Sequence, residues 1–125
     1  MNIVRILRIL LACIAAVVVL GSCAFAQKIE QLTVDDVDVA SVRSGEYTGS
    51  VRILPVTATV RVTVKDGAIT EIDLVRHFHG PDHGADEILG RVMAAQSLAV
   101  DAVAGATYSS KVVLKAIEQA LKKGQ

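Results

Sequence analysis

The sequence predicts an α+β fold: a small antiparallel sheet with two helices, preceded by an N-terminal signal or anchor segment. Three stretches between residues 45 and 76 have the composition of strands, and Asp66-Gly67 is a hairpin turn signal between two of them. Two later stretches carry apolar residues at helical spacing. We therefore divide the chain into a signal or anchor at 1–26, a polar tether at 27–44 and one domain at 45–125.

The N-terminal segment has the three parts of a secretory signal. Arg5 and Arg8 precede an unbroken apolar run, and small residues follow it. Residues 20–23 resemble a bacterial lipobox, which would make Cys23 the lipidated first residue. The alternatives are cleavage after Ala24-Phe25-Ala26, which releases a soluble protein, and retention of 9–26 as a membrane anchor. All three fates place the domain on the outer face of the cytoplasmic membrane or in the periplasm, and we expect the lipid anchor.

Composition excludes several classes of function. Both cysteines, Cys13 and Cys23, lie in the N-terminal segment, so the domain has no disulfide or thiol chemistry. The whole chain has 13 basic and 13 acidic residues. Loss of residues 1–26 removes Arg5 and Arg8 but no acid, which leaves a mildly acidic domain. An acidic domain with few aromatic residues is not expected to bind nucleic acid.

The strands are expected in three consecutive stretches. Gly45–Ile53 suits a first strand. Thr57–Lys65 alternates, with Val60, Val62 and Val64 on one face, as in a half-buried strand. Ala68–Arg76 follows the turn as a third strand. Its apolar residues at 69 and 72 differ in parity, so we expect a bulge or a register change between them.

Two helices are expected after the sheet. His77–Gly84 contains glycine and proline and predicts a loop. Ala85–Gln96 and Ser109–Lys122 have helical periodicity, and the second ends in basic residues followed by glycine. The small residues of Asp101–Ala106 form the loop that leads into the second helix.

This loop is the stretch of the domain with the clearest chemical interpretation. Residues 101–107 read D-A-V-A-G-A-T, and Tyr108, Ser109 and Ser110 follow. A helix N-terminus exposes N–H groups and a partial positive charge, so it binds phosphate, and small side chains let a ligand approach the backbone. The alternative is that Thr107 or Ser109 merely caps the helix. Spacing alone favours the cap, because hydroxyl caps are frequent.

The string D-A-V-A-G-A-T-Y-S-S resembles the flavinylation motif of the FMN-binding domain family. That family includes the C subunit of the sodium-translocating NADH:quinone reductase and the G subunit of the Rnf complex. Ala102 and Ala104 stand where the family often has glycine and a hydroxyl residue. The Tyr47-Thr48-Gly49 start, the V-x-V-x-V-K-D-G-x-I-T-x-I strand pair and the approach from Gln96 also resemble the family's minimal form. The resemblance therefore runs from Gly45 to Leu121.

The resemblance implies FMN bound covalently to Thr107 through a phosphoester. It implies a flavin transferase that uses FAD and magnesium to make this bond. It also implies an electron carrier at the membrane that serves a redox partner protein or a quinone-linked complex. Such a domain is not expected to be a complete enzyme, and no catalytic residues are assigned. An alternative is a module that binds FMN non-covalently or acts as a sensor. The cofactor-binding residues expected are Thr107, Asp101, Gly105, Ala106, Tyr108, Ser109, His77 and His79.

The histidines supply a third interpretation. His77, His79 and His83 have H-x-H-x3-H spacing, with Asp82 and Asp86 nearby, and imidazoles are common zinc or copper ligands. An anchored metal-binding domain would use this loop. No fourth strong ligand is present, however, and the equivalent loop of the resembling family approaches the flavin. We therefore expect flavin contact or an exposed loop, and no bound metal.

Overall fold

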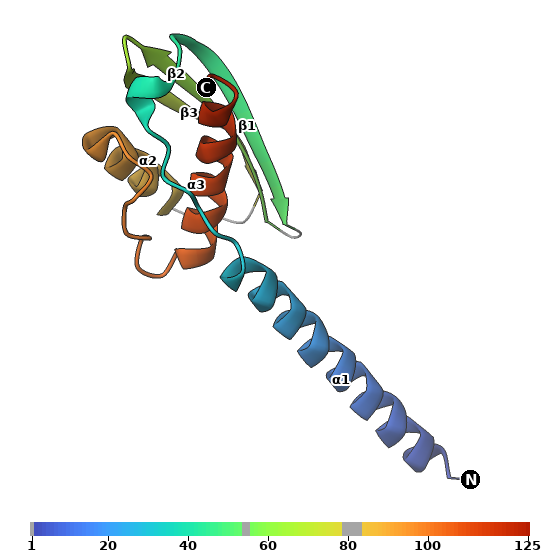
Figure 1. Cartoon of the computed structure of the whole chain (residues 1–125). Helices are drawn as coiled ribbons and strands as arrows, with labels where there is room; N and C mark the ends of the chain where they lie inside the picture. The colour runs from blue at the N-terminus through green and yellow to red at the C-terminus, as the bar shows by residue number, and fades with distance from the viewer. Residues whose placement is uncertain (1, 54–55, 79–83) are drawn as a thin grey trace. The chain divides into compact units, whose positions relative to one another are not determined.

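The computed structural model describes residues 2–53, 56–78 and 84–125 (Figure 1). Side chains at 22–26, 28–29, 77–78 and 84–85 are also outside the description. The chain divides into two compact units, Met1–Gln31 and Leu32–Gln125.

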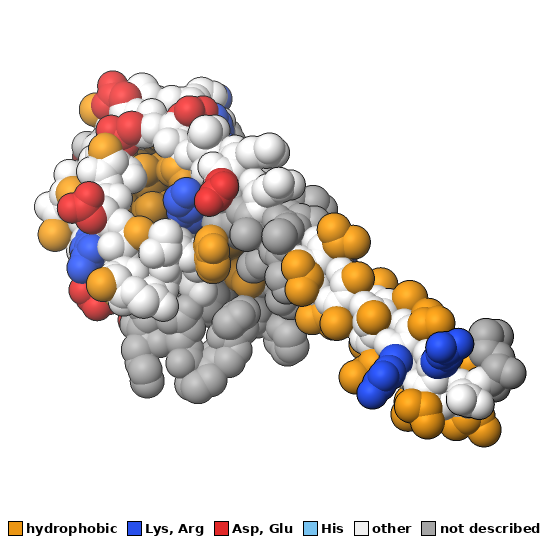
Figure 2. All heavy atoms as spheres, turned by 90° about the horizontal axis from the view of Figure 1, so that it is seen from below, with side chains coloured by type: hydrophobic (Ala, Val, Ile, Leu, Met, Phe, Trp, Pro, Cys, Tyr) orange, Lys and Arg blue, Asp and Glu red, His pale blue; other side chains and the backbone are white. Residues whose placement is uncertain are grey.

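The first unit contains one helix, α1, which spans Ile3–Glu30. Its stretch Ile3–Gly21 has a mean hydropathy of 2.7. In Figure 2, hydrophobic side chains lie along this helix and basic side chains lie near its start. By length and composition the helix could cross a membrane, and a signal sequence would have the same properties. Cys13 is exposed on α1, whereas the side chain of Cys23 lies outside the description.

The second unit is built on three antiparallel strands in the order β1-β2-β3. The strands are β1 (Gly45–Ile53), β2 (Val56–Lys65) and β3 (Ala68–Phe78). Buried and half-buried residues alternate along β2, as predicted from its sequence. Asp66 and Gly67 connect β2 to β3 with φ angles of 52° and 76°. These positive angles are those of a tight hairpin turn, which confirms the turn expected there.

The third strand contains the expected bulge. The register of β2 against β3 shifts directly after Thr63 and again directly after Thr59. The first shift passes over Thr70 and so brings Ile69 and Ile72 opposite inward-facing valines of β2. An inserted residue restores the side-chain alternation that the parity of the sequence lacks. β3 also continues to Phe78, beyond the predicted end at Arg76.

Two helices lie on one face of the sheet (Figure 1). The helix α2 (Gly84–Ala95) packs on α3 and β3, and α3 (Thr107–Lys122) packs on β1 and β2. Burial of apolar side chains between the layers is the main source of stability in such a domain. This arrangement confirms the predicted α+β architecture. Its largest fully buried side chains are Ile88, Ile117, Leu121, Glu118, Val56, Val60, Val62, Val64, Val92, Val112 and Val113.

The sheet and α3 approach each other closely at Gly49 of β1. A Cβ atom at this position would lie 1.9 Å from the carbonyl oxygen of Ala116 and 2.7 Å from the nitrogen of Ala120. Both atoms belong to the backbone of α3, which cannot move aside like a side chain. Gly49 therefore lets α3 lie directly on β1.

Much of the segment expected as a polar tether packs on the domain. Within 27–44, the residues from Leu32 onward belong to the second unit, where Val37, Val39 and Val42 are buried. A short 3₁₀ helix, η1, spans Val39–Ser41. The three valines alternate with acidic and small residues, so the average composition is polar although one side of the segment is apolar.

Glu118 of α3 fastens this segment to the domain. Its carboxylate is 1% exposed and accepts hydrogen bonds from Lys115 at 2.9 Å and from the backbone N–H of Asp35 at 3.0 Å. The ammonium group of Lys122 donates to the other carboxylate oxygen, and that of Lys115 also donates to the carbonyl of Thr33. Burial alone raises the pKa of the Glu118 carboxyl. The hydrogen bonds from the two ammonium groups and the N–H outweigh burial, so this pKa lies below its ordinary value.

Two side chains that directly follow helices α2 and α3 bond the two outer strands of the sheet, β3 and β1. The amide of Gln96 accepts from the N–H of Ile69 at 2.7 Å and donates to the carbonyl of the same residue at 3.0 Å. The ammonium group of Lys123 donates to the carbonyl of Thr48 in β1. Some of the backbone groups that an edge strand exposes are thus occupied within the chain.

Candidate functional site

The loop predicted at 101–106 ends in a tight turn at the start of α3. The N–H of Ala106 donates to the carbonyl of Val103 at 3.0 Å. Gly105, inside this turn, has a φ of 79°, a conformation that residues with side chains rarely adopt. No described atom lies within 4 Å of the place where a Cβ of Gly105 would be. The backbone at Gly105 is therefore open to a ligand.

The helix α3 begins at Thr107, two residues earlier than predicted, and its N-cap is Ala106. An alanine has no side-chain oxygen with which to cap the helix. Neither Thr107 nor Ser109 is the N-cap, so the cap interpretation of these hydroxyls is wrong. The N–H groups at the start of a helix and its partial positive charge attract anions, so this position favours a phosphate group.

The three hydroxyls near this helix start differ in exposure. Thr107 is exposed, whereas Ser109 is 5% exposed and Ser110 is fully buried. Tyr108 lies between them and is 46% exposed. Thr107 therefore has the one aliphatic hydroxyl of this group that an enzyme can reach without unfolding the helix.

Two further residues contact the backbone of the loop. The hydroxyl of Ser110 accepts a hydrogen bond from the N–H of Val103 at 3.1 Å. Arg91 of α2 donates to the carbonyls of Asp101 at 2.9 Å and Ala102 at 3.3 Å. Sequence reasoning missed both roles. Arg91 looked like an ordinary polar residue of a helix, and only the packing of α2 beside the loop brings its guanidinium to these carbonyls.

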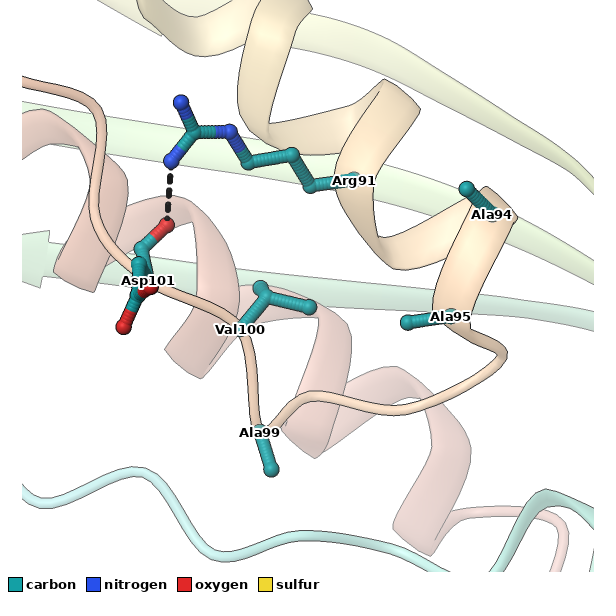
Figure 3. A pocket seen from close by; sticks show the side chains of 6 residues that line it. All are labelled: Arg91, Ala94, Ala95, Ala99, Val100 and Asp101. Carbon is teal, nitrogen blue, oxygen red and sulfur yellow. Dashed lines mark hydrogen bonds between the residues drawn. The ribbon is translucent and has the colours of Figure 1, made fainter.

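A shallow, open depression of about 640 Å³ lies where α2 meets the beginning of the loop (Figure 3). Alanine and valine side chains line it, with Arg91 and Asp101 at its polar side. The Asp101 carboxylate is exposed and has no ion pair with a described residue, because Arg91 binds the carbonyl of Asp101 instead. The lining residues are Arg91, Ala94, Ala95, Ala99, Val100 and Asp101.

The structure describes the expected histidine site only in part. The backbone of His77 pairs with Ala58 near the end of β3, and its side chain is outside the description. His79 and His83 lie outside the described residues. Among the side chains that the structure does describe, no three of His, Cys, Asp or Glu form a group that could hold a metal. The predicted histidine contact with flavin and the alternative metal site both remain predictions.

A comparison with known protein families finds a match that includes the loop at 101–106. The family model described as FMN-binding domain matches residues 55–122. This match covers more than half of the chain and includes β2, β3, both helices of the second unit and the loop. A search of curated proteins found no match.

Proposed function

Since the chain belongs to the FMN-binding domain family, we propose that it carries its FMN covalently, through a phosphoester to Thr107, and transfers electrons outside the cytosol. FMN supplies the redox chemistry when bound. The protein supplies attachment, position and electrostatic environment.

The exposure of Thr107 at the start of α3, directly after the N-cap Ala106, carries this proposal. A phosphate joined to its oxygen would lie beside the first N–H groups of α3, where the partial positive charge of the helix favours an anion. The backbone at Gly105 is open on the approach to this point. Ser109 and Ser110, the competing acceptors, are buried, which supports Thr107 over both of them.

The attachment step is a transfer of the FMN group from FAD, catalysed by a separate flavin transferase with magnesium. The Thr107 oxygen forms a bond to the phosphorus of the FMN part, and the phosphoanhydride bond to AMP breaks. AMP leaves, and the hydroxyl proton of Thr107 passes to solvent or to a base of the transferase. The exposed Asp101 carboxylate stands at the other end of the loop, where we expect it to orient Thr107 or to help hold the transferase's magnesium.

For the isoalloxazine ring we propose a position over the small residues of the loop at 101–106 and the edge of the sheet. Small apolar side chains present a flat surface to an aromatic ring system, and flavin sites are mostly apolar. His77 and His79 are the expected contacts from the end of β3 and the segment after it. The electron partner we propose is a redox protein or a quinone-linked complex at the membrane.

Intact mass spectrometry after coexpression with a flavin transferase and export tests this proposal. We expect the wild type to gain one FMN group and Thr107→Ala to gain none. Thr107→Ala should remain folded, at a cost of at most about 1 kcal/mol, because Thr107 is exposed and caps nothing. Thr107→Ser should retain part of the modification, because the nucleophilic oxygen stays.

The matched control is Ser109→Ala, which should be modified like the wild type. An FMN-sized mass gain that persists in Thr107→Ala would show that the acceptor residue is wrong. A flavin absorption band that disappears on denaturation would show non-covalent binding instead.

A further inference from the structure

We propose that Ser110 and Arg91 are positioning residues that hold the loop at 101–106 in the shape in which Thr107 accepts FMN. This inference rests on the proposed function and assigns a task to two residues outside the attachment point. The side chain of each residue bonds backbone atoms of the loop. These contacts fix the path of the loop and leave its small side chains uncovered.

Ser110 holds the later part of the loop. Its hydroxyl, fully buried, accepts the hydrogen bond from the N–H of Val103, and Val103 is itself 7% exposed. The backbone N–H of Ser110 donates to the carbonyl of Ala106 at 2.9 Å, and the N–H of Ala106 donates to the carbonyl of Val103. These three hydrogen bonds connect Val103, Ala106 and Ser110 in a closed ring. Thr107 and Gly105 are on the chain within that ring, so its loss would release both.

Arg91 holds the beginning of the loop. One guanidinium nitrogen donates to two successive carbonyls, those of Asp101 and Ala102. Another nitrogen pairs with the Glu87 carboxylate at 2.7 Å, which keeps the side chain extended along α2. Because the guanidinium is occupied by carbonyls, the carboxylate of Asp101 is left exposed beside the depression (Figure 3). Arg91 thus joins α2 to the loop without neutralising Asp101.

A preformed acceptor loop should speed the attachment step, because the transferase does not have to order the chain around Thr107 first. Loss of either contact would let the loop sample shapes in which the Thr107 oxygen and the first N–H groups of α3 are misplaced. The effect should fall on the rate of modification and not on the overall fold.

The test measures the rate of FMN attachment to the purified, exported domain by purified flavin transferase with FAD and magnesium. Rates are followed by intact mass, well below the lowest melting temperature of the set. Ser110→Ala and Arg91→Met should be modified at least about tenfold more slowly than the wild type, the change expected for loss of one hydrogen bond that orders the reacting group. Arg91→Lys, which keeps a cationic donor, should recover part of the rate. The amide of Val103 should exchange with solvent faster in unmodified Ser110→Ala, an observation that does not depend on flavin.

Val113→Ala and Glu87→Gln are the matched controls. The first loosens the buried face of α3 about one turn after Ser110 without touching a hydrogen bond of the loop, and the second removes the charge of Glu87 but keeps an oxygen that can accept from Arg91. Both should be modified at nearly the wild-type rate. Wild-type rates in Ser110→Ala and Arg91→Met would overturn the positioning role and leave the acceptor assignment intact. A wild type that is modified elsewhere than Thr107, or not at all, would overturn both. A slowing shared by Val113→Ala would assign the effect to general loosening of the helix and would also overturn the inference.

Discussion

Gly49 is a residue whose importance comes entirely from what lies opposite it. A methyl group there would meet the backbone of α3 at Ala116, so the helix would have to move away from β1. We expect Gly49→Ala to lower the free energy of unfolding by about 3 kcal/mol, at the upper end for overpacked positions. Urea unfolding followed by circular dichroism measures this loss.

Gly90 is the control for that substitution. It lies in α2 with no described atom within 4 Å of an added Cβ. Gly90→Ala should therefore leave stability unchanged or raise it by up to about 1 kcal/mol, since alanine has the higher helix propensity. Equal unfolding midpoints for both variants would contradict the role of Gly49.

Single residues also show which features the sequence could predict and which it could not. Asp66-Gly67 predicted its turn, because only a short list of residues tolerates positive φ, and that preference is local. The hydroxyls at 107 and 109 misled the cap prediction. Local propensity favours a serine or threonine cap, but the packing that buries Ser109 and Ser110 in the domain starts the helix at Thr107, after an alanine. That packing is set by distant parts of the chain.

At the scale of elements, the buried carboxylate of Glu118 helps to join the segment at 32–44 to α3. Glu118 has a pKa below its ordinary value, so its charged form stabilises the folded state. A carboxyl whose pKa is lower in the folded state than in the unfolded state stabilises the fold fully at any pH above its unfolded pKa. This stabilisation is lost as pH falls through its folded pKa. The junction should therefore weaken in acid, below about pH 4.5.

The corresponding experiment compares the wild type with Glu118→Gln across pH. At pH 7 we expect the variant to be less stable by about 1.5 to 3 kcal/mol, the range for hydrogen bonds to a charged group. This difference should shrink as pH falls below about 4.5, because the Glu118 carboxyl of the unfolded chain then binds a proton before that of the folded protein does. Urea unfolding at pH 7 and at a pH below about 4.5 measures this stability difference. Glu71→Gln, at an exposed position of β3, is the control, and a pH-independent difference for Glu118→Gln would refute the linkage.

The elements themselves were largely predictable. Alternation along β2 and helical spacing along α2 and α3 are short-range patterns, and each gave an element within a few residues of its observed bounds. The segment at 32–44 was harder to interpret. Its valines at 37, 39 and 42 are too few and too mixed with acids to predict burial, and Glu118, which bonds the N–H of Asp35, is 83 residues away from it in the sequence.

For the molecule as a whole, the N-terminal helix predicts where the domain resides. Arg5 and Arg8 precede the apolar stretch, and basic residues stay on the cytoplasmic side. A reporter that is active only in the cytosol, fused after Gln125, should therefore be inactive. Replacement of both arginines by glutamate should reduce export. Full reporter activity from the wild-type fusion would rule out an extracytosolic domain.

The side chains at the two sheet edges matter for how copies of the protein behave together. A valine-rich sheet with two open borders is a template onto which another chain can add a strand, and polymers grow in this way. The amide of Gln96 and the ammonium group of Lys123 occupy backbone positions on the two borders. Each folded copy therefore offers fewer places for a neighbour to join, which protects the protein from forming fibrils at high local concentration.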